Sequence, residues 1–339
     1  PEMSRGLGDV YKRQVLSYGK ICYNDHKEAA KMELRVLHYF LAVAREQSIS
    51  AAAEALHLSQ PALSTQLKAM EEELGKQLMI RGTKGSRRVT LTEEGMILRK
   101  RAEEILALVK RTEEEITRSE DAIVGNVYIG SGETDIVRFF ARAARRIQKQ
   151  YPDIRYHISS GNAEYVLEYL EKGLIDFGLL FRSIDAGKYE SVPISVKDSW
   201  GVLMRKDSPL ALKESIHPED LWDQPLILSH QRGDDQYLAN WMGREVSALK
   251  VTATYNLVFN ASLLVEEGLG YALCLDKLIN TQGSRLCFRP VSPPLEASAC
   301  IVWKKYQVFS KAAETFLNCL RELLENPLET EALREIHGK

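Results

Sequence analysis

The chain has 339 residues and a mass of 38.4 kDa, which is enough for two or three domains with substantial buried cores. It is 45% hydrophobic and 27% charged, with a formal net charge of -2, so its composition excludes disordered, collagen-like and mucin-like chains. No stretch approaches the roughly 18 consecutive apolar residues of a membrane span, and no secretory leader opens the chain. We therefore expect a cytoplasmic protein without a membrane partner.

The cysteines and the absent motifs weaken the case for metal, cofactor or catalytic chemistry. The cysteines are odd in number and scattered, with no Cys-x-x-Cys pair and no histidine at metal-ligand spacing, so we expect reduced thiols. A Walker loop, a full Gly-x-Gly-x-x-Gly turn, Gly-x-Ser-x-Gly and His-Glu-x-x-His are all missing. We expect no metal, no cofactor and no enzymatic activity. The five cysteines are Cys22, Cys274, Cys287, Cys300 and Cys319.

Residues 1–31 lack convincing periodicity, whereas Met32 opens a clean helical pattern. We interpret residues 1–31 as a non-native or disordered extension and Met32 as the native start. The alternative is a short basic arm, with Lys12 and Arg13, that contacts DNA.

Three short helices are predicted after Met32. The apolar spacing indicates helices over about 34–44 and 50–56, the second rich in alanine. A third helix is expected after the turn, with Ser59 as its N-cap and Pro61 in its first turn. Small alanines allow two helices to cross closely, so this order is typical of a helix-turn-helix.

The third helix has one apolar and one polar face. Leu63, Leu67 and Met70 mark the buried stripe. Short hydroxyl and amide side chains near a helix N-terminus can donate to phosphates and read base edges. The alternative is a solvated polar face. The residues left available to solvent or DNA are Gln60, Ala62, Ser64, Thr65, Gln66 and Lys68.

The segment 82–91, with Arg81 directly before it, predicts a β-hairpin, because two glycines mark a turn and Val89 and Leu91 alternate. Its cations carry no acidic partner in the segment and stand beside the helix-turn-helix, so they suit phosphates or a minor groove. A solvated charged face is the alternative. The cations are Arg81, Lys84, Arg87 and Arg88.

A long helix is predicted over 92–120, opened by Thr92 with acidic residues in its first turn. Its apolar positions are spaced alternately four and three apart, which predicts pairing with a second copy of the helix. The alternative is packing on the protein's own body. These positions are Leu98, Ala102, Ile105, Val109, Thr112 and Ile116.

Short motifs follow one another in a fixed order between residues 40 and 95. They are Phe40, the alanine-rich stretch 48–56, Leu-Ser-Gln-Pro-Ala-Leu-Ser at 58–64, Glu-Glu-Glu-Leu-Gly at 71–75, Leu-x-x-Arg at 78–81 and Leu-Thr-Glu-Glu-Gly at 91–95. In order and spacing, residues 32–116 closely resemble the DNA-binding region and linker helix of the bacterial LysR-type transcriptional regulators.

This resemblance implies a winged helix-turn-helix over 32–91 and a linker and dimerisation helix over 92–120. Two positions depart from the family pattern: Thr65 stands where many members carry Arg or Lys, and Met79 replaces the usual Phe. The first departure implies one phosphate contact fewer. The implied recognition positions are Ser59, Gln60, Pro61, Ala62, Ser64, Thr65 and Gln66, with Lys68, Arg81, Lys84, Arg87 and Arg88 as backbone contacts.

Beyond Ala122 strands and helices alternate, which predicts a parallel sheet. This half resembles the family's effector-binding domain, two α/β lobes related to periplasmic binding proteins. Lobe I is expected over 124–196 and 290–325 and lobe II over 197–289, with crossings near Val196 and Pro290. The expected strands are 124–130, 154–158, 175–180, 200–204, 226–228, 271–274 and 299–303; the expected helices are 134–149, 166–173 and a terminal helix through Phe316.

A ligand site is expected between the lobes, beyond the carboxyl ends of the strands, where helix N-termini present backbone N–H groups. Glu133 would repel an anion there, so either the ligand is zwitterionic or cationic, or Glu133 caps its own helix. His230 has either a structural role or a contact with the ligand. The candidate effector residues are Ser131, Gly132, Glu133, Thr134, Gly161, Asn162, Ser229, His230, Gln231 and Arg232.

The expected fold is multi-domain: an all-α winged helix-turn-helix domain with a long linker helix, followed by an α/β two-lobe effector-binding domain. The expected function is transcription regulation by a homodimer or homotetramer that binds double-stranded DNA and responds allosterically to a small molecule. The alternatives are a cytoplasmic small-molecule-binding protein without a sequence-specific DNA role, and an enzyme that uses the cleft.

Overall fold

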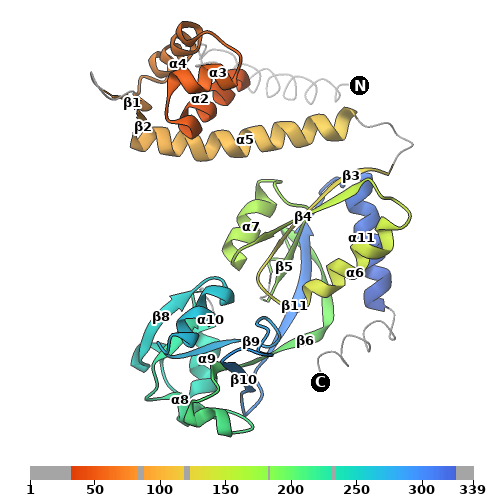
Figure 1. Cartoon of the computed structure of the whole chain (residues 1–339). Coiled ribbons are helices and arrows are strands. Elements are labelled where there is room, and N and C mark those ends of the chain that lie inside the picture. The colour runs from red at the N-terminus through yellow and green to blue at the C-terminus, as the bar shows by residue number, and fades with distance from the viewer. Residues whose placement is uncertain (1–31, 83–87, 118–122, 182–183, 231–233, 326–339) are drawn as a thin grey trace, which may run out of the picture. The chain divides into compact units, whose positions relative to one another are not determined.

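The computed structural model describes residues 32–82, 88–117, 123–181, 184–230 and 234–325 (Figure 1). The chain divides into two compact units, residues 1–112 and 113–339. The predictions made for residues 1–31, Cys22, Lys84, Arg87, Gln231 and Arg232 lie outside the described residues.

The first unit begins with three helices in the predicted positions: α2 (Leu34–Glu46), α3 (Ile49–Ala55) and α4 (Gln60–Leu74). The hydroxyl of Ser48 caps α3, and that of Ser59 accepts a hydrogen bond from the Ala62 amide and caps α4. The helices enclose an apolar core, which confirms the predicted stripe. Its fully buried members include Phe40, Leu63 and Leu67.

A two-stranded antiparallel wing follows, made of β1 (Met79–Arg81) and β2 (Val89–Leu91). Met79 is 1% exposed and belongs to the core, so it fills the position expected of the family's Phe. Thr92 then accepts a hydrogen bond from the Gly95 amide at 3.0 Å and starts α5 (Glu93–Thr117). The hairpin and the cap agree with the sequence predictions.

The apolar residues of α5 divide into two sets, and this corrects the single seam predicted from the sequence. Leu98 and Ala102 are 9% and 0% exposed and pack into the core of α2–α4. By contrast, Ile105, Leu108 and Ile116 are exposed, the last by 77%. The first half of α5 therefore packs on the protein's own body, whereas its second half presents an apolar surface.

The second unit contains one long mixed sheet, in the order β4-β3-β5-β11-β6-β9-β7-β8, with β10 paired to β6 (Figure 1). Its strands are β3 (Gly125–Ser131), β4 (Ile154–Ser160), β5 (Phe177–Leu180), β6 (Tyr189–Arg205), β7 (Leu226–Ser229), β8 (Val251–Tyr255), β9 (Tyr271–Leu275), β10 (Leu286–Pro290) and β11 (Glu296–Lys304).

Parallel pairing, as predicted, is present in each half of the sheet, but the strands that carry the chain between the two halves run antiparallel to their neighbours. β3 pairs in parallel with β4 and β5, and β7 with β8 and β9, but β11 runs antiparallel to both β5 and β6. The reason is that β6 carries the chain out of lobe I and β11 brings it back. β6 pairs with β11 as far as Ser199 and with β9 from Trp200 onward, so the lobes change within this one strand.

Helices cover both faces of each part of the sheet. In lobe I, Phe139, Phe177 and Phe316 lie in one core shared by α6, α11 and the sheet. In lobe II, Val202 and Leu228 face one core and Leu203 and Ile227 the other, as the alternation of a strand requires. The helices are α6 (Val137–Gln148), α7 (Ala163–Glu171), α8 (Pro218–Leu221), α9 (Asp234–Met242), α10 (Val258–Glu266) and α11 (Lys311–Glu325).

Within the described ranges, no helix has the length and apolarity to cross a bilayer, and no group of three acidic, histidine or cysteine side chains is arranged to hold a metal ion. Cys274, Cys287, Cys300 and Cys319 carry free thiols. Burial raises the pKa of the Cys274 thiol to about 12, so this sulfur stays protonated at neutral pH.

Candidate DNA-binding surface and ligand cleft

The polar face of α4 is open to solvent. Gln60, Pro61, Ala62, Thr65, Gln66 and Lys68 are exposed, and Ser64 is half-buried. Two of these side chains have local partners: the Thr65 hydroxyl donates to the Pro61 carbonyl at 2.9 Å, and the Lys68 ammonium lies 3.4 Å from Glu72. An ion pair between two exposed side chains is weak, so Lys68 can exchange Glu72 for a phosphate.

Arg81 connects the wing to α4. Its guanidinium donates to the Ser64 hydroxyl at 3.3 Å and lies 3.7 Å from the Glu71 carboxylate. Glu71 also accepts hydrogen bonds from the amides of Leu78 and Met79, at 2.8 and 3.0 Å. Arg81 therefore orients the wing, in addition to the phosphate contact expected from the sequence.

Arg88 is held at the other strand of the wing. Its Nε donates to the side chain of Gln47 at 3.0 Å, and the Gln47 carbonyl accepts from the Val89 amide at 2.8 Å. Gln47 ends α2 in a left-handed conformation, with φ of 51°. Sequence reasoning missed Gln47 and Glu71, because their partners lie on other elements and no spacing rule connects them.

The polar side chains expected to bind a ligand in lobe I instead hold the local structure. The buried Ser131 hydroxyl donates to the Gly132 carbonyl at 2.7 Å, and the buried Thr134 hydroxyl donates to Asp198 on β6. The Asn162 side chain accepts from the Tyr165 amide at 2.9 Å and caps α7. At Gly161 a Cβ atom would lie 2.2 Å from the Tyr165 ring, so this position requires glycine.

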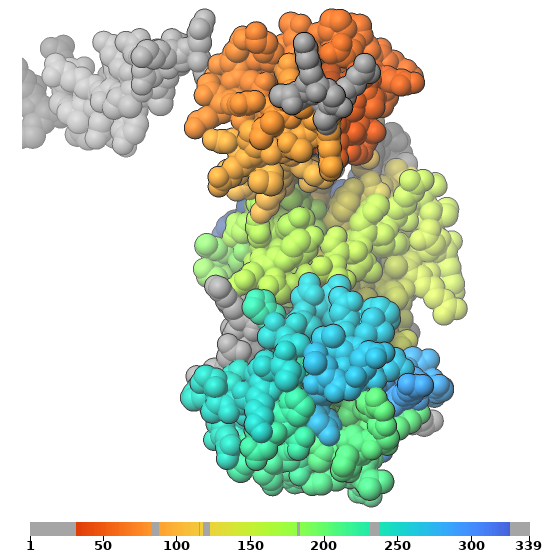
Figure 2. Space-filling view, turned by 60° about the vertical axis from the view of Figure 1, so that its left-hand side comes forward, coloured from red at the N-terminus to blue at the C-terminus, as the bar shows by residue number. Residues whose placement is uncertain are grey.

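Glu133 contacts lobe II, not its own helix. Its Oε2 accepts a hydrogen bond from the amide of Val258, the first residue of α10. The N-cap residue of α10 is Leu257, which has no side-chain acceptor, so Glu133 supplies the cap that the helix lacks. The lobe II surface coloured cyan to blue accordingly lies against lobe I (Figure 2). The expectation that Glu133 caps its own helix is wrong.

A second polar group lies where the lobes join. Asp135 pairs with Arg138 at 2.6 Å, and Asp198 is 2% exposed. Lys277, in a left-handed conformation after β9, belongs to the same group. Burial lowers the pKa of its ammonium, while the carboxylates of Asp276, Asp135 and Asp198 oppose this shift. No sequence pattern predicts this network, because its members lie on three separate segments.

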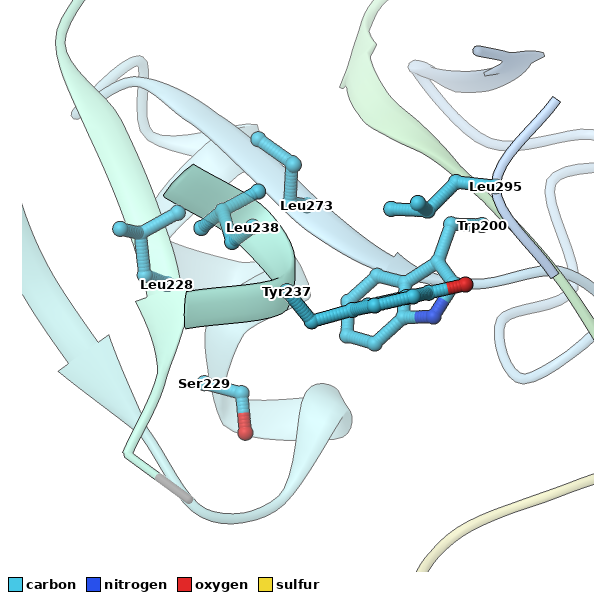
Figure 3. Close-up of a pocket in the computed structure, with 7 residues that line it drawn as sticks. All are labelled: Trp200, Leu228, Ser229, Tyr237, Leu238, Leu273 and Leu295. Atoms are coloured by element: carbon cyan, nitrogen blue, oxygen red, sulfur yellow. The ribbon is translucent and has the colours of Figure 1, made fainter. Parts of the chain in front are cut away.

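One pocket lies in lobe II, at the carboxyl end of β7 (Figure 3). The predicted Ser229 lies at this pocket, whereas the side chain of His230 is exposed and its amide donates to the Tyr255 carbonyl at 2.7 Å. The lining consists of Trp200, Leu228, Ser229, Tyr237, Leu238, Leu273 and Leu295.

Comparisons with known proteins agree with this architecture. A family model described as a bacterial regulatory helix-turn-helix protein of the lysR family matches residues 34–96, and one described as the LysR substrate binding domain matches residues 121–325. The uncharacterized HTH-type transcriptional regulator YvbU of Bacillus subtilis is 24% identical over 294 residues, 86% of this chain and 99% of YvbU. The HTH-type transcriptional regulator AlsR of the same species is 34% identical over 58% of this chain and 64% of AlsR.

Solved structures show the same fold. CbnR, described as a LysR family transcriptional regulator, is similar with a TM-score of 0.68 at 20% identity, covering 87% of this chain and 100% of CbnR. Its full-length complex with target DNA gives a TM-score of 0.67 at 21% identity, over 86% of this chain and 99% of that one. Since the substrate-binding model alone matches more than half of the sequence, the chain belongs to the LysR family of transcriptional regulators, with a helix-turn-helix domain followed by a substrate-binding domain.

Proposed function

We propose that α4 enters the major groove of promoter DNA and that the wing contacts the adjacent backbone. The exposed polar face of α4, framed by Arg81 and Arg88, is the observation that carries this assignment. The CbnR complex with its target DNA supports it, because that protein has the same fold. The proposed contacts are Ser59, Gln60, Pro61, Ala62, Ser64, Thr65, Gln66, Lys68, Arg81, Lys84, Arg87 and Arg88.

The exposed half of α5 supports assembly into a homo-oligomer. Ile105, Leu108 and Ile116 are large apolar side chains that water solvates poorly, and burying them against a second copy of α5 stabilises a pair of chains. A pair of chains presents two recognition helices, which sets the spacing of two DNA half-sites. The protein acts in the cytoplasm, as a regulator without catalytic activity.

A small molecule bound between the lobes acts as the effector. Glu133 and Val258 join the lobes, so a ligand that alters this contact changes the relative stability of two lobe arrangements. Through the oligomer, that change alters the spacing of the recognition helices. The proposed effector residues are Ser131, Gly132, Glu133, Thr134, Gly161, Asn162, Ser229, His230, Gln231 and Arg232.

Footprinting tests this function. The wild-type protein is expected to protect two half-sites in the intergenic DNA next to its own gene. Gln66→Ala is expected to lose this protection while retaining binding to random duplex, because amide side chains read base edges. Gln282→Ala, which changes an exposed glutamine of the second unit, is the matched control. Equal protection by the wild type and Gln66→Ala would contradict the assignment of α4.

A further inference from the structure

We propose that Gln47 is a positioning residue for DNA binding, which holds the Arg88 guanidinium of the wing in the orientation that meets a phosphate of the DNA backbone. This inference rests on the proposed function, because the phosphate contact of Arg88 is part of it. It assigns a role to a residue outside α4 and the wing. Gln47 ends α2, and β2 lies beside that end of the helix (Figure 1).

The backbone of Gln47 has a conformation that favours glycine. Its φ of 51° and ψ of 23° lie in the left-handed region, which a side chain makes unfavourable. α4 ends in the same conformation, with φ of 63° and ψ of 22°, and the residue there is Gly75. Residues held in such conformations cluster at functional sites. The turn alone therefore does not explain why a glutamine stands at this position.

Two hydrogen bonds join Gln47 to the wing, and only one of them depends on its side chain. The Gln47 carbonyl accepts from the Val89 amide at 2.8 Å, a bond that any residue at this position can make. Val89 is 5% exposed, so this bond anchors β2 beside the core. The Gln47 Oε1 accepts from the Arg88 Nε at 3.0 Å, which glycine cannot do. The side chain thus acts on Arg88, while the backbone holds the strand.

The bond to Arg88 affects orientation more than folding stability. Both side chains are exposed, so water replaces either partner when the bond breaks. A guanidinium is a planar fork of donors, and holding its Nε fixes the direction in which the fork faces a phosphate. The amide of Gln47 is neutral, so this bond does not neutralise the guanidinium. An arginine that is oriented before binding loses less side-chain entropy when it contacts DNA.

Fluorescence anisotropy of the full chain on a random duplex, at one fixed salt concentration, tests the inference. Gln47→Gly removes the bond to Arg88 and keeps the backbone bond to Val89. It is expected to weaken binding about 2- to 12-fold, which corresponds to the cost of ordering one side chain. In an Arg88→Ala background the same substitution is expected to change binding by less than about twofold, because Gln47 acts through Arg88. Unchanged binding by Gln47→Gly, or an equal loss in both backgrounds, would overturn the inference.

Thermal unfolding of the same variants separates a positioning role from a structural one. Gln47→Gly relieves the left-handed backbone and is expected to keep or raise the melting temperature. Gln47→Met keeps the strained backbone but replaces the amide with a thioether, a weak acceptor, and is expected to weaken DNA binding by the same factor as Gln47→Gly. If the melting temperature of Gln47→Gly fell together with its DNA affinity, the role would be structural and the inference would be wrong.

Tyr306→Gly is the matched control. Tyr306 is an exposed residue of the second unit with φ of 61°, so this substitution makes the same backbone change away from the wing. DNA binding by Tyr306→Gly is expected to equal that of the wild type. A loss as large as that of Gln47→Gly would show that the effect is not specific to Arg88 and would oppose the inference.

Arg88→Ala on its own separates this inference from the proposed function. If Arg88→Ala weakens DNA binding and Gln47→Gly does not, the inference fails and the wing contact is retained. If Arg88→Ala binds DNA as the wild type does, the wing contact itself is contradicted, and the inference fails with it. A loss in both single variants, without a further loss when they are combined, supports both.

Discussion

Removal of the Glu133 carboxylate tests whether this side chain of lobe I caps helix α10 of lobe II and so joins the two lobes. The first four N–H groups of a helix have no partner within the helix, and Leu257 cannot cap α10. The Val258 amide therefore depends on Glu133 for its hydrogen bond. A carboxylate at a partly buried helix N-terminus contributes about 1–2 kcal/mol, which corresponds to a factor of about 5–30 in an equilibrium.

Hydrogen exchange at the Val258 amide, resolved by mass spectrometry with fragmentation, measures this contact directly. Glu133→Ala is expected to raise the exchange rate of this amide by about 5- to 30-fold. Glu133→Gln keeps an acceptor but loses the charge, so its effect is expected to be intermediate. Glu164→Ala removes an exposed acid from the first turn of α7 and is the matched control. If Glu133→Ala left exchange at Val258 unchanged, the cap across the lobes would be refuted.

Three further predictions concern the first unit and α5. Arg88→Ala should weaken binding to all DNA sequences and reduce the salt slope of the binding constant by about 0.9 in a salt titration, and an unchanged slope would exclude a phosphate contact. Gln60→Ala should reduce the difference in binding free energy between the cognate site and random duplex by about 1–3 kcal/mol. If binding to both duplexes weakened equally, Gln60 would contact the DNA backbone and not a base. Ile105→Asp combined with Leu108→Asp should dissociate the oligomer in light scattering, because both side chains are exposed on α5, and an intact oligomer would oppose the proposed pairing.

Local signals made the first unit predictable. The caps Ser59 and Thr92 and the apolar spacing of α2 and α4 are properties of neighbouring residues, and they fix helices within a few positions. The wing could be located for the same reason. The sequence pattern could not predict that Leu98 and Ala102 are buried while Ile105 is exposed. All three residues fit the same heptad, and only the elements that pack against them differ.

The second unit was less predictable, because its key contacts join distant residues. Thr134 and Asp198 are 64 positions apart, and Glu133 and Val258 are 125 apart. Residues 189–199 of β6 were not predicted as a strand, although Ile194, Val196 and Asp198 alternate inward. Pro193 within this run argues against a strand, because proline has no N–H to donate, and the pairing of β6 with β11 shifts register between Pro193 and Lys197.

The pocket in lobe II was also missed, apart from Ser229. Trp200 and Tyr237 are 37 positions apart in the chain, and neither is part of a sequence pattern that distinguishes it from an ordinary core or surface aromatic residue. The ligand site was instead predicted at polar residues that follow the strand ends, because helix N-termini commonly bind anions. In the folded chain those polar side chains are largely used for capping and for contacts with neighbouring segments.

The central claim is sequence-preferring DNA binding by this LysR family member. Fluorescence anisotropy with the purified full chain measures it most directly, on the intergenic DNA upstream of its own gene and on a random duplex of equal length, at one fixed salt concentration. We predict binding to the intergenic DNA at least a thousand-fold tighter than to the random duplex, the lower range for specific regulators. Equal affinity for the two duplexes would contradict the claim.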